Sequence, residues 1–131
     1  MTKKINAAVL GCTGYTGLEL INILCKHPNV SINFLGTRNN EGAYINDFDQ
    51  RLKNASLPKL SLLNNINFSE IDVVFFALPH GISQKIIKKN YGKSIFIDLS
   101  ADFRIKDPDI YKKNYNSDHL CSDLLDKFIY G

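Results

Sequence analysis

The residues with the clearest chemical potential are three glycines placed three positions apart, directly after a short apolar run. Gly11, Gly14 and Gly17 follow residues 5–10 and predict a tight turn between a strand and a helix. Few side chains obstruct such a turn, so its backbone N–H groups and the positive end of the following helix bind a pyrophosphate. The residues predicted to bind it are Gly11, Thr13, Gly14, Tyr15, Thr16 and Gly17. A plain turn and a mononucleotide site are the alternatives, whereas a P-loop is excluded because its G-x-x-x-x-G-K-[ST] pattern does not occur.

A helix is predicted directly after this turn. Thr16 and Glu19 have the T-x-x-E spacing of a capping box at a helix start. Apolar residues then recur at helical spacing, which predicts a buried face made of Leu18, Ile21, Leu24 and Cys25. Pro28 indicates that the helix has ended before that position.

The end of the next predicted strand indicates which dinucleotide the turn would serve. An NAD site has Asp or Glu there to accept from the ribose 2′-hydroxyl. The chain instead has Thr37 and Arg38, and the nearest acid, Glu41, lies three residues further on. A guanidinium beside a hydroxyl matches a 2′-phosphate, so Thr37 and Arg38 predict NADP(H) as the cofactor. The alternative is a solvated loop arginine.

The remaining elements must position these residues. The apolar runs predict further strands at residues 30–35, 59–63, 72–78 and 94–99. Helices are predicted at residues 82–89 and 107–114, and a long loop with one helical turn is predicted at residues 37–56. Alternating strands and helices indicate the α/β class, with a Rossmann-like, doubly wound, mostly parallel sheet.

Ligands of such sheets bind beyond the carboxyl ends of the strands. We therefore expect the glycine turn, residues 36–38 and the segment Pro79, His80 and Gly81 to converge on one crevice, which Ser100 borders. These four residues complete the predicted cofactor-binding set. Two roles are open for His80, which follows a strand: it lines the nicotinamide region or it caps the next helix.

Composition excludes several classes of protein. The 131 residues fit one domain, and 44% hydrophobic and 22% charged residues are globular values. The net charge of +3 is mild and dispersed, which does not favour nucleic-acid binding. No apolar run approaches the roughly 20 residues of a membrane span. Three cysteines without a C-x-x-C pair predict free thiols, a cytoplasmic location and no metal site.

Several segments together carry a family resemblance. They are GCTGYTGLEL (11–20), His27-Pro28, Thr37-Arg38, DVVFFALPHG (72–81), IDLSADFR (97–104), Asp107-Pro108 with Tyr111 and Tyr115, and His119 followed by FIYG (128–131). With these segments the chain resembles the N-terminal part of the N-acetyl-gamma-glutamyl-phosphate reductases. The resemblance extends over essentially the whole chain.

This resemblance implies NADPH-dependent reduction of N-acetyl-L-glutamyl 5-phosphate to the 5-semialdehyde, a step of arginine biosynthesis. In the family a cysteine thiolate attacks the acyl phosphate, and NADPH reduces the resulting thioester. The family's nucleophile and catalytic histidine lie beyond Gly131, so we expect no catalytic residue here. Residues 1–131 are expected to form the NADP-binding domain, with the catalytic domain downstream, and to be inactive alone. A small-molecule acyl phosphate and a homo-oligomer are implied for the full-length enzyme.

Alternative interpretations stay open at this point. An aspartate-semialdehyde-dehydrogenase-like reductase and a self-standing, non-catalytic NADP-binding domain both fit the glycine turn. A short-chain dehydrogenase is disfavoured because no tyrosine is followed by lysine four residues later. We interpret Cys12, Cys25 and Cys121 as structural rather than catalytic. Asp102 and Arg104 are interpreted as a structural pair, with contact to a substrate phosphate as the alternative.

Overall fold

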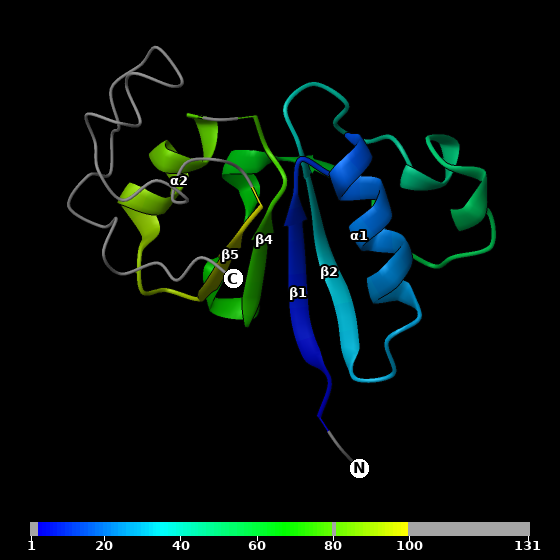
Figure 1. Ribbon diagram of the computed structural model, residues 1–131, viewed down its shortest axis with the longest axis horizontal. Coiled ribbons are helices and arrows are strands. Elements are labelled where there is room, and N and C mark those ends of the chain that lie inside the picture. The colour runs from blue at the N-terminus through cyan, green and yellow to red at the C-terminus, as the bar shows by residue number, and fades with distance from the viewer. Residues whose placement is uncertain (1–2, 80, 100–131) are drawn as a thin grey trace.

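One parallel sheet organises the chain, whose computed structural model describes residues 3–79 and 81–99. The strands are β1 (Ile5–Leu10), β2 (Val30–Thr37), β3 (Leu60–Leu62), β4 (Val73–Phe76) and β5 (Ile95–Asp98). All four pairings are parallel, and the strand order is β3-β2-β1-β4-β5 (Figure 1). This order confirms the predicted Rossmann-like sheet, in which ligands bind where the order reverses beside the first strand.

Helices follow two of the strands. α1 (Tyr15–Cys25) leads from β1 to β2, and α2 (Ile82–Asn90) leads from β4 to β5. Figure 1 shows the two helices on either side of the central strand β1. The other connections contain short 3-10 turns, at Ile45–Asp47, Gln50–Leu52, Leu63–Asn65 and Phe68–Glu70. Within the described residues, no helix is long and apolar enough to span a membrane.

The core consists of two hydrophobic clusters, one for each face of the sheet. The cluster beneath α1 includes Val9, Ile21, Leu24 and Leu35. The cluster beneath α2 includes Ala8, Leu10, Phe76 and Ile87. Consecutive residues of β1 therefore alternate between the clusters, and all are fully buried from Ala7 to Leu10. Burial on both faces explains why the sequence of this strand is a continuous apolar run.

The start of α1 differs from the prediction. Its N-cap is Gly14, in extended backbone (φ −78°, ψ 168°), and no side chain of the described residues caps this end. The predicted capping box is wrong because the helix begins one residue before Thr16, which places that hydroxyl inside the first turn. Glu19 instead forms an ion pair with Arg51.

The buried face of α1 also differs in one position. Cys25 is exposed, so its assignment to the core is wrong. It is the last residue of α1, while Gly17, Ile21, Asn22 and Leu24 form the face that turns toward the sheet. The polar Asn22 lies within this stripe because Asp49 and the carbonyl oxygen of Leu18 accept hydrogen bonds from its amide.

The other boundaries are close to those predicted. β2 extends two residues beyond the predicted end and so includes Thr37. In the loop after β2, two 3-10 turns replace the single helical turn. α2 confirms the helix predicted at residues 82–89. The helix predicted at residues 107–114 lies outside the described residues.

Candidate functional site

The glycine turn is fixed between the ends of two strands. The backbone N–H groups of Gly11 and Cys12 donate to the carbonyl oxygen of Gly36 in β2, over 3.0 and 3.3 Å. On the other side, Ala77 after β4 donates to the carbonyl oxygen of Leu10 over 2.8 Å. The carboxyl ends of β1, β2 and β4 thus meet at one edge of the sheet, which we call the cofactor edge, and the predicted segments converge there.

Two of the three glycines are required by packing. Gly11 has a φ of +85°, and a Cβ there would overlap the carbonyl oxygen of Ala77. A Cβ on Gly17 would overlap the carbonyl oxygen of Gly11 and lie 2.9 Å from the Cα of Cys12. These positions allow close contact between turn, strand and helix, which is a purely structural requirement.

The middle glycine is different. The nearest atom to a Cβ on Gly14 would be the carbonyl oxygen of Gly11 at 3.8 Å, an ordinary van der Waals contact. Gly14 is exposed and is the N-cap of α1. Since the fold does not require a glycine here, its absent side chain leaves the helix start open to an outside group. The first N–H groups of a helix have no intrahelical acceptor and attract anions.

The flanking residues of the turn differ in exposure. Tyr15 is 93% exposed, Thr16 is exposed and Thr13 is half-buried. Cys12 is fully buried, and burial raises the pKa of its thiol to about 12. A thiol protonated at neutral pH is a poor nucleophile, which supports the structural interpretation of Cys12.

Thr37 and Arg38, the two residues at the end of β2 that predict the choice of dinucleotide, differ in exposure. Thr37 is 3% exposed and pairs with Leu62 in the sheet. Arg38 follows directly and is exposed. The guanidinium is therefore the part of this pair that is accessible at the surface of the cofactor edge.

Beyond β4 the chain turns into α2. Pro79 is exposed, its carbonyl oxygen accepts from the N–H of Ile82 over 3.3 Å, and Gly81 is the N-cap of α2 with a φ of +88°. A positive φ explains the glycine at this position. The predicted site residues His80 and Ser100 lie outside the described residues, as do Asp102, Arg104 and Cys121. In the described ranges there is no cluster of three or more His, Cys, Asp or Glu side chains that could hold a metal ion.

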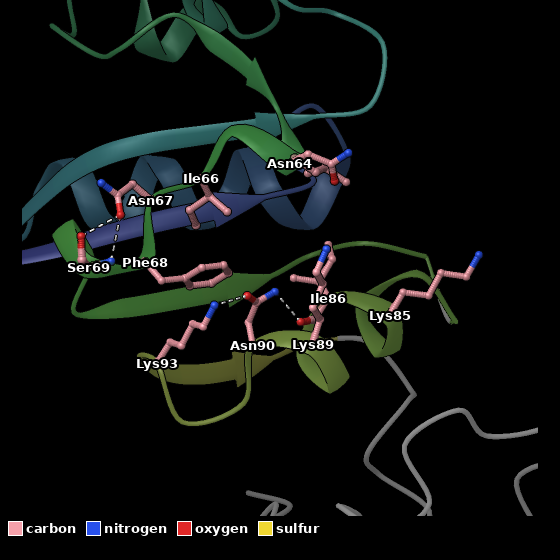
Figure 2. Close-up of a pocket in the computed structure, with 11 residues that line it drawn as sticks. Asn64, Ile66, Asn67, Phe68, Ser69, Lys85, Ile86, Lys89, Asn90 and Lys93 are labelled. Carbon is pink, nitrogen blue, oxygen red and sulfur yellow. Dashed lines mark hydrogen bonds between the residues drawn. The ribbon is translucent and has the colours of Figure 1, made fainter.

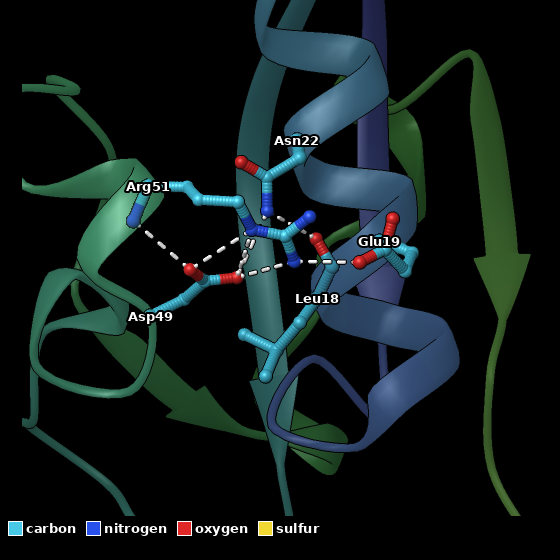
Figure 3. Close-up of polar contacts among 5 residues, drawn as sticks. All are labelled: Leu18, Glu19, Asn22, Asp49 and Arg51. Atoms are coloured by element: carbon cyan, nitrogen blue, oxygen red, sulfur yellow. Dashed lines mark hydrogen bonds and ion pairs between the residues drawn. The ribbon is translucent and has the colours of Figure 1, made fainter.

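A cluster of polar side chains that holds the loop after β2 against α1 was not predicted from the sequence. Arg51 binds Asp49 through its Nε and Nη2 atoms and Glu19 of α1 over 2.6 Å (Figure 3). Asn22 of α1 donates to the same Asp49 carboxylate over 3.0 Å. Hydrogen bonds from Arg51 lower the pKa of Asp49 to about 2. This cluster attaches the loop after β2 to α1, and short polar residues in a loop give no sequence signal for it.

Comparison with known proteins agrees with this geometry. Residues 6–131 match the family model described as semialdehyde dehydrogenase, NAD binding domain. N-acetyl-gamma-glutamyl-phosphate reductase from Ehrlichia ruminantium (strain Gardel) is 43% identical over 133 residues, which covers 100% of this chain and 38% of that protein. The Paracoccus denitrificans protein of the same name is 40% identical over 127 residues, covering 97% and 37%. The chain thus spans less than two fifths of these relatives.

A solved structure shares the fold. The aspartate semialdehyde dehydrogenase with NADP from Candida albicans has a TM-score of 0.65 and 26% identity, covering 81% of this chain and 32% of that one. The match of the family model covers almost the whole chain, including the glycine turn and the five described strands except for Ile5 of β1. The chain belongs to the family of NAD-binding domains of semialdehyde dehydrogenases.

Proposed function

We propose that this chain is the cofactor-binding part of an N-acetyl-gamma-glutamyl-phosphate reductase. The observation that carries the proposal is 43% identity over the whole chain to a relative of that name. The reaction is the NADPH-dependent reduction of N-acetyl-L-glutamyl 5-phosphate to the 5-semialdehyde. An aspartate-semialdehyde-dehydrogenase-like reductase is the second candidate, which the Candida albicans structure favours at a lower identity of 26%.

The residues of the cofactor edge fit a dinucleotide. Gly14 leaves the N-terminus of α1 open, so the N–H groups of Tyr15 and Thr16 are suited to hold a pyrophosphate. The exposed Tyr15 and Thr16 side chains border the same opening. When bound, NADPH supplies the hydride, and the role of this chain is to hold and orient it. The segment from Pro79 to Gly81 completes the predicted binding set with Ser100.

Arg38 supports NADPH over NADH. The guanidinium is exposed directly beyond the end of β2, where it is suited to pair with a ribose 2′-phosphate. Among the described residues, no acid follows β2 directly: Arg38 takes that position, and the nearest acid in the sequence, Glu41, lies three residues further along the loop. The Candida albicans relative, whose structure contains NADP, is consistent with this choice.

We place the catalytic nucleophile and base outside these 131 residues, in a second domain that follows this one. Two observations support this. The relatives are more than twice as long as the part that this chain matches. Within the described residues, Cys12 is buried with a raised pKa, and Cys25 is the last residue of α1, at the opposite end of that helix from the glycine turn. The complete enzyme would act on a small-molecule acyl phosphate in the cytoplasm, as a homo-oligomer.

An activity assay tests this proposal. We expect the 131 residues alone not to oxidise NADPH in the presence of N-acetylglutamyl phosphate, and a polypeptide that includes the second domain to do so. Aspartyl phosphate, supplied in parallel, separates the two candidate substrates. Turnover by the 131 residues alone that is lost in Cys12→Ser or Cys25→Ser would contradict the proposal.

A further inference from the structure

The face of the sheet that carries α2 has a groove between this helix and the crossover from β3 to β4. The crossover from β3 to β4 contains two 3-10 turns, Leu63–Asn65 and Phe68–Glu70, where parallel strands are usually joined by a helix. These short turns leave a groove of about 790 Å³ between the crossover and α2 (Figure 2). This volume lies within the range of small-molecule sites, about 300–1,000 Å³.

The floor of the groove is apolar and well supported. It is formed by half-buried side chains of Leu63, Ile66, Phe68 and Ile86. The ring of Phe68 packs against Phe96 of β5 at 5.9 Å between centroids. The hydroxyl of Ser94 donates to the carbonyl oxygens of Phe68 and Ile71 over 3.2 and 2.8 Å. An apolar ligand body would therefore meet a surface that is already ordered.

One side of the groove is basic. Lys85 and Lys89 lie one turn apart on α2, and Lys93 follows the helix (Figure 2). Lys93 is held by the side-chain oxygen of Asn90 over 3.0 Å, with its ammonium 5.9 Å from the centre of the Phe68 ring. The described residues that line the groove include no carboxylate, and none in the described part of the chain pairs with these lysines.

The opposite side is polar and uncharged. Asn64, Asn67 and Ser69 of the crossover face the lysines across the groove (Figure 2). The N–H and hydroxyl of Ser69 donate to the side-chain oxygen of Asn67, which fixes that amide in place. The groove thus combines an apolar floor, a cationic side and an amide-bearing side.

We propose that this groove is a second ligand site, which binds an amphipathic organic anion. The apolar body of the ligand, of ring or short-acyl size, rests on Phe68 and Ile86, and its acidic head meets Lys85 and Lys89. Lysines in a last helical turn also complement the helix dipole. Lys88 and Lys89 are both in that turn, whereas Lys85 lies one turn earlier, so the dipole does not account for Lys85 beside the apolar floor.

One end of the groove adjoins the cofactor edge, because Leu63 follows β3 and lies 2.9 Å from the position of a Cβ on Gly36. Phe68 precedes β4 and Lys89 lies in the last turn of α2, so these two ligand contacts are toward the other end of the groove. We therefore expect the anion and the dinucleotide to bind at the same time.

The test uses 8-anilinonaphthalene-1-sulfonate, an aromatic anion whose fluorescence rises in apolar surroundings. Its binding to the purified protein is titrated in the wild type and in Lys89→Glu, with Lys88→Glu as the control. Both variants change the net charge equally and alter the same helix, but only Lys89 lines the groove. Thermal unfolding of each variant verifies that it is folded. A third variant, Phe68→Leu, changes the apolar floor of the groove without changing its charge.

We expect Lys89→Glu to weaken binding by about five- to tenfold, because a lost cation in a half-open groove becomes a repulsive carboxylate. Lys88→Glu should change it by less than about twofold, since Lys88 does not line the groove and its charge is screened by solvent and salt. Saturating NADPH should not displace the probe. Equal effects of the two lysine variants, displacement by NADPH, or no saturable binding by the wild type would each overturn the proposal.

Discussion

The backbone N–H of Gly11 donates to the carbonyl oxygen of Gly36 over 3.0 Å, which joins the glycine turn directly to the end of β2. Arg38 lies two residues beyond Gly36, so this hydrogen bond brings the exposed guanidinium to the edge that the open helix start of α1 also faces. The glycine turn is predicted to bind the pyrophosphate and Arg38 the ribose 2′-phosphate. The backbone hydrogen bond between Gly11 and Gly36 joins these two parts of the predicted site.

The two later glycines of the turn should respond differently to the same substitution. Gly14→Val should remain folded, at a cost of about 1 kcal/mol for a poorer N-cap, because a Cβ there meets nothing closer than 3.8 Å. It should nevertheless lose dinucleotide binding, because the side chain would occupy the opening at the start of α1. Urea unfolding and NADPH titration measure the two effects separately.

Gly17→Val is the matched comparison. Its Cβ would overlap the carbonyl oxygen of Gly11, so the variant should lose several kcal/mol of stability or fail to fold. If Gly14→Val bound NADPH as the wild type does, the cofactor would have to bind elsewhere.

Acid should selectively weaken the contact between the loop and α1. Hydrogen bonds from Arg51 lower the pKa of Asp49 from 3.8 to about 2, so the folded state favours the ionised carboxyl. Stability from this group is present above the unfolded pKa and is lost as the pH falls through the folded pKa. The difference in unfolding free energy between wild type and Asp49→Asn should thus be constant near neutrality and shrink from about pH 4 to pH 2. Urea titrations at several pH values measure it, and a difference that grew on acidification would contradict the assignment.

The cysteines should differ in reactivity. Cys25 is exposed and should react with a thiol reagent in the native protein at pH 8. Cys12 should react only after unfolding, since it is fully buried and its pKa is raised to about 12. The experiment is done in a Cys121→Ser background, with Cys25→Ser to isolate Cys12. Rapid native labelling of Cys12 would refute its role as a small buried residue of the turn.

Much of the fold could be predicted because local patterns and tertiary environment agree. β1 and β4 are buried on both faces, so their apolar runs were clear signals. The capping box failed because T-x-x-E is a short pattern, and the extended backbone at Gly14 starts the helix earlier. Helical spacing alone also placed Cys25 in the core, although the chain leaves α1 at that residue.

The sequence predicted the backbone turn of the site, but it predicted less well the residues that hold this turn and the neighbouring loop in place. The glycine spacing indicated the turn, but it could not show that Gly11 and Gly17 are required by packing while Gly14 is open. The cluster of Glu19, Asn22, Asp49 and Arg51 includes a hydrogen bond between residues 27 positions apart, Asn22 and Asp49, which no local pattern encodes. The groove beside α2 arises because a crossover lacks a helix, and this depends on how two distant segments pack.

The most direct test of the central claim is calorimetric titration of NADPH and NADH into the wild type and Arg38→Ala. Lys26→Ala, which removes an exposed charge at the far end of α1, is the control. The wild type should bind NADPH more tightly, and Arg38→Ala should lose about 1.5–3 kcal/mol of NADPH binding while NADH binding barely changes. Equal affinity of the wild type for both cofactors, or an equal loss for both in Arg38→Ala, would contradict the account.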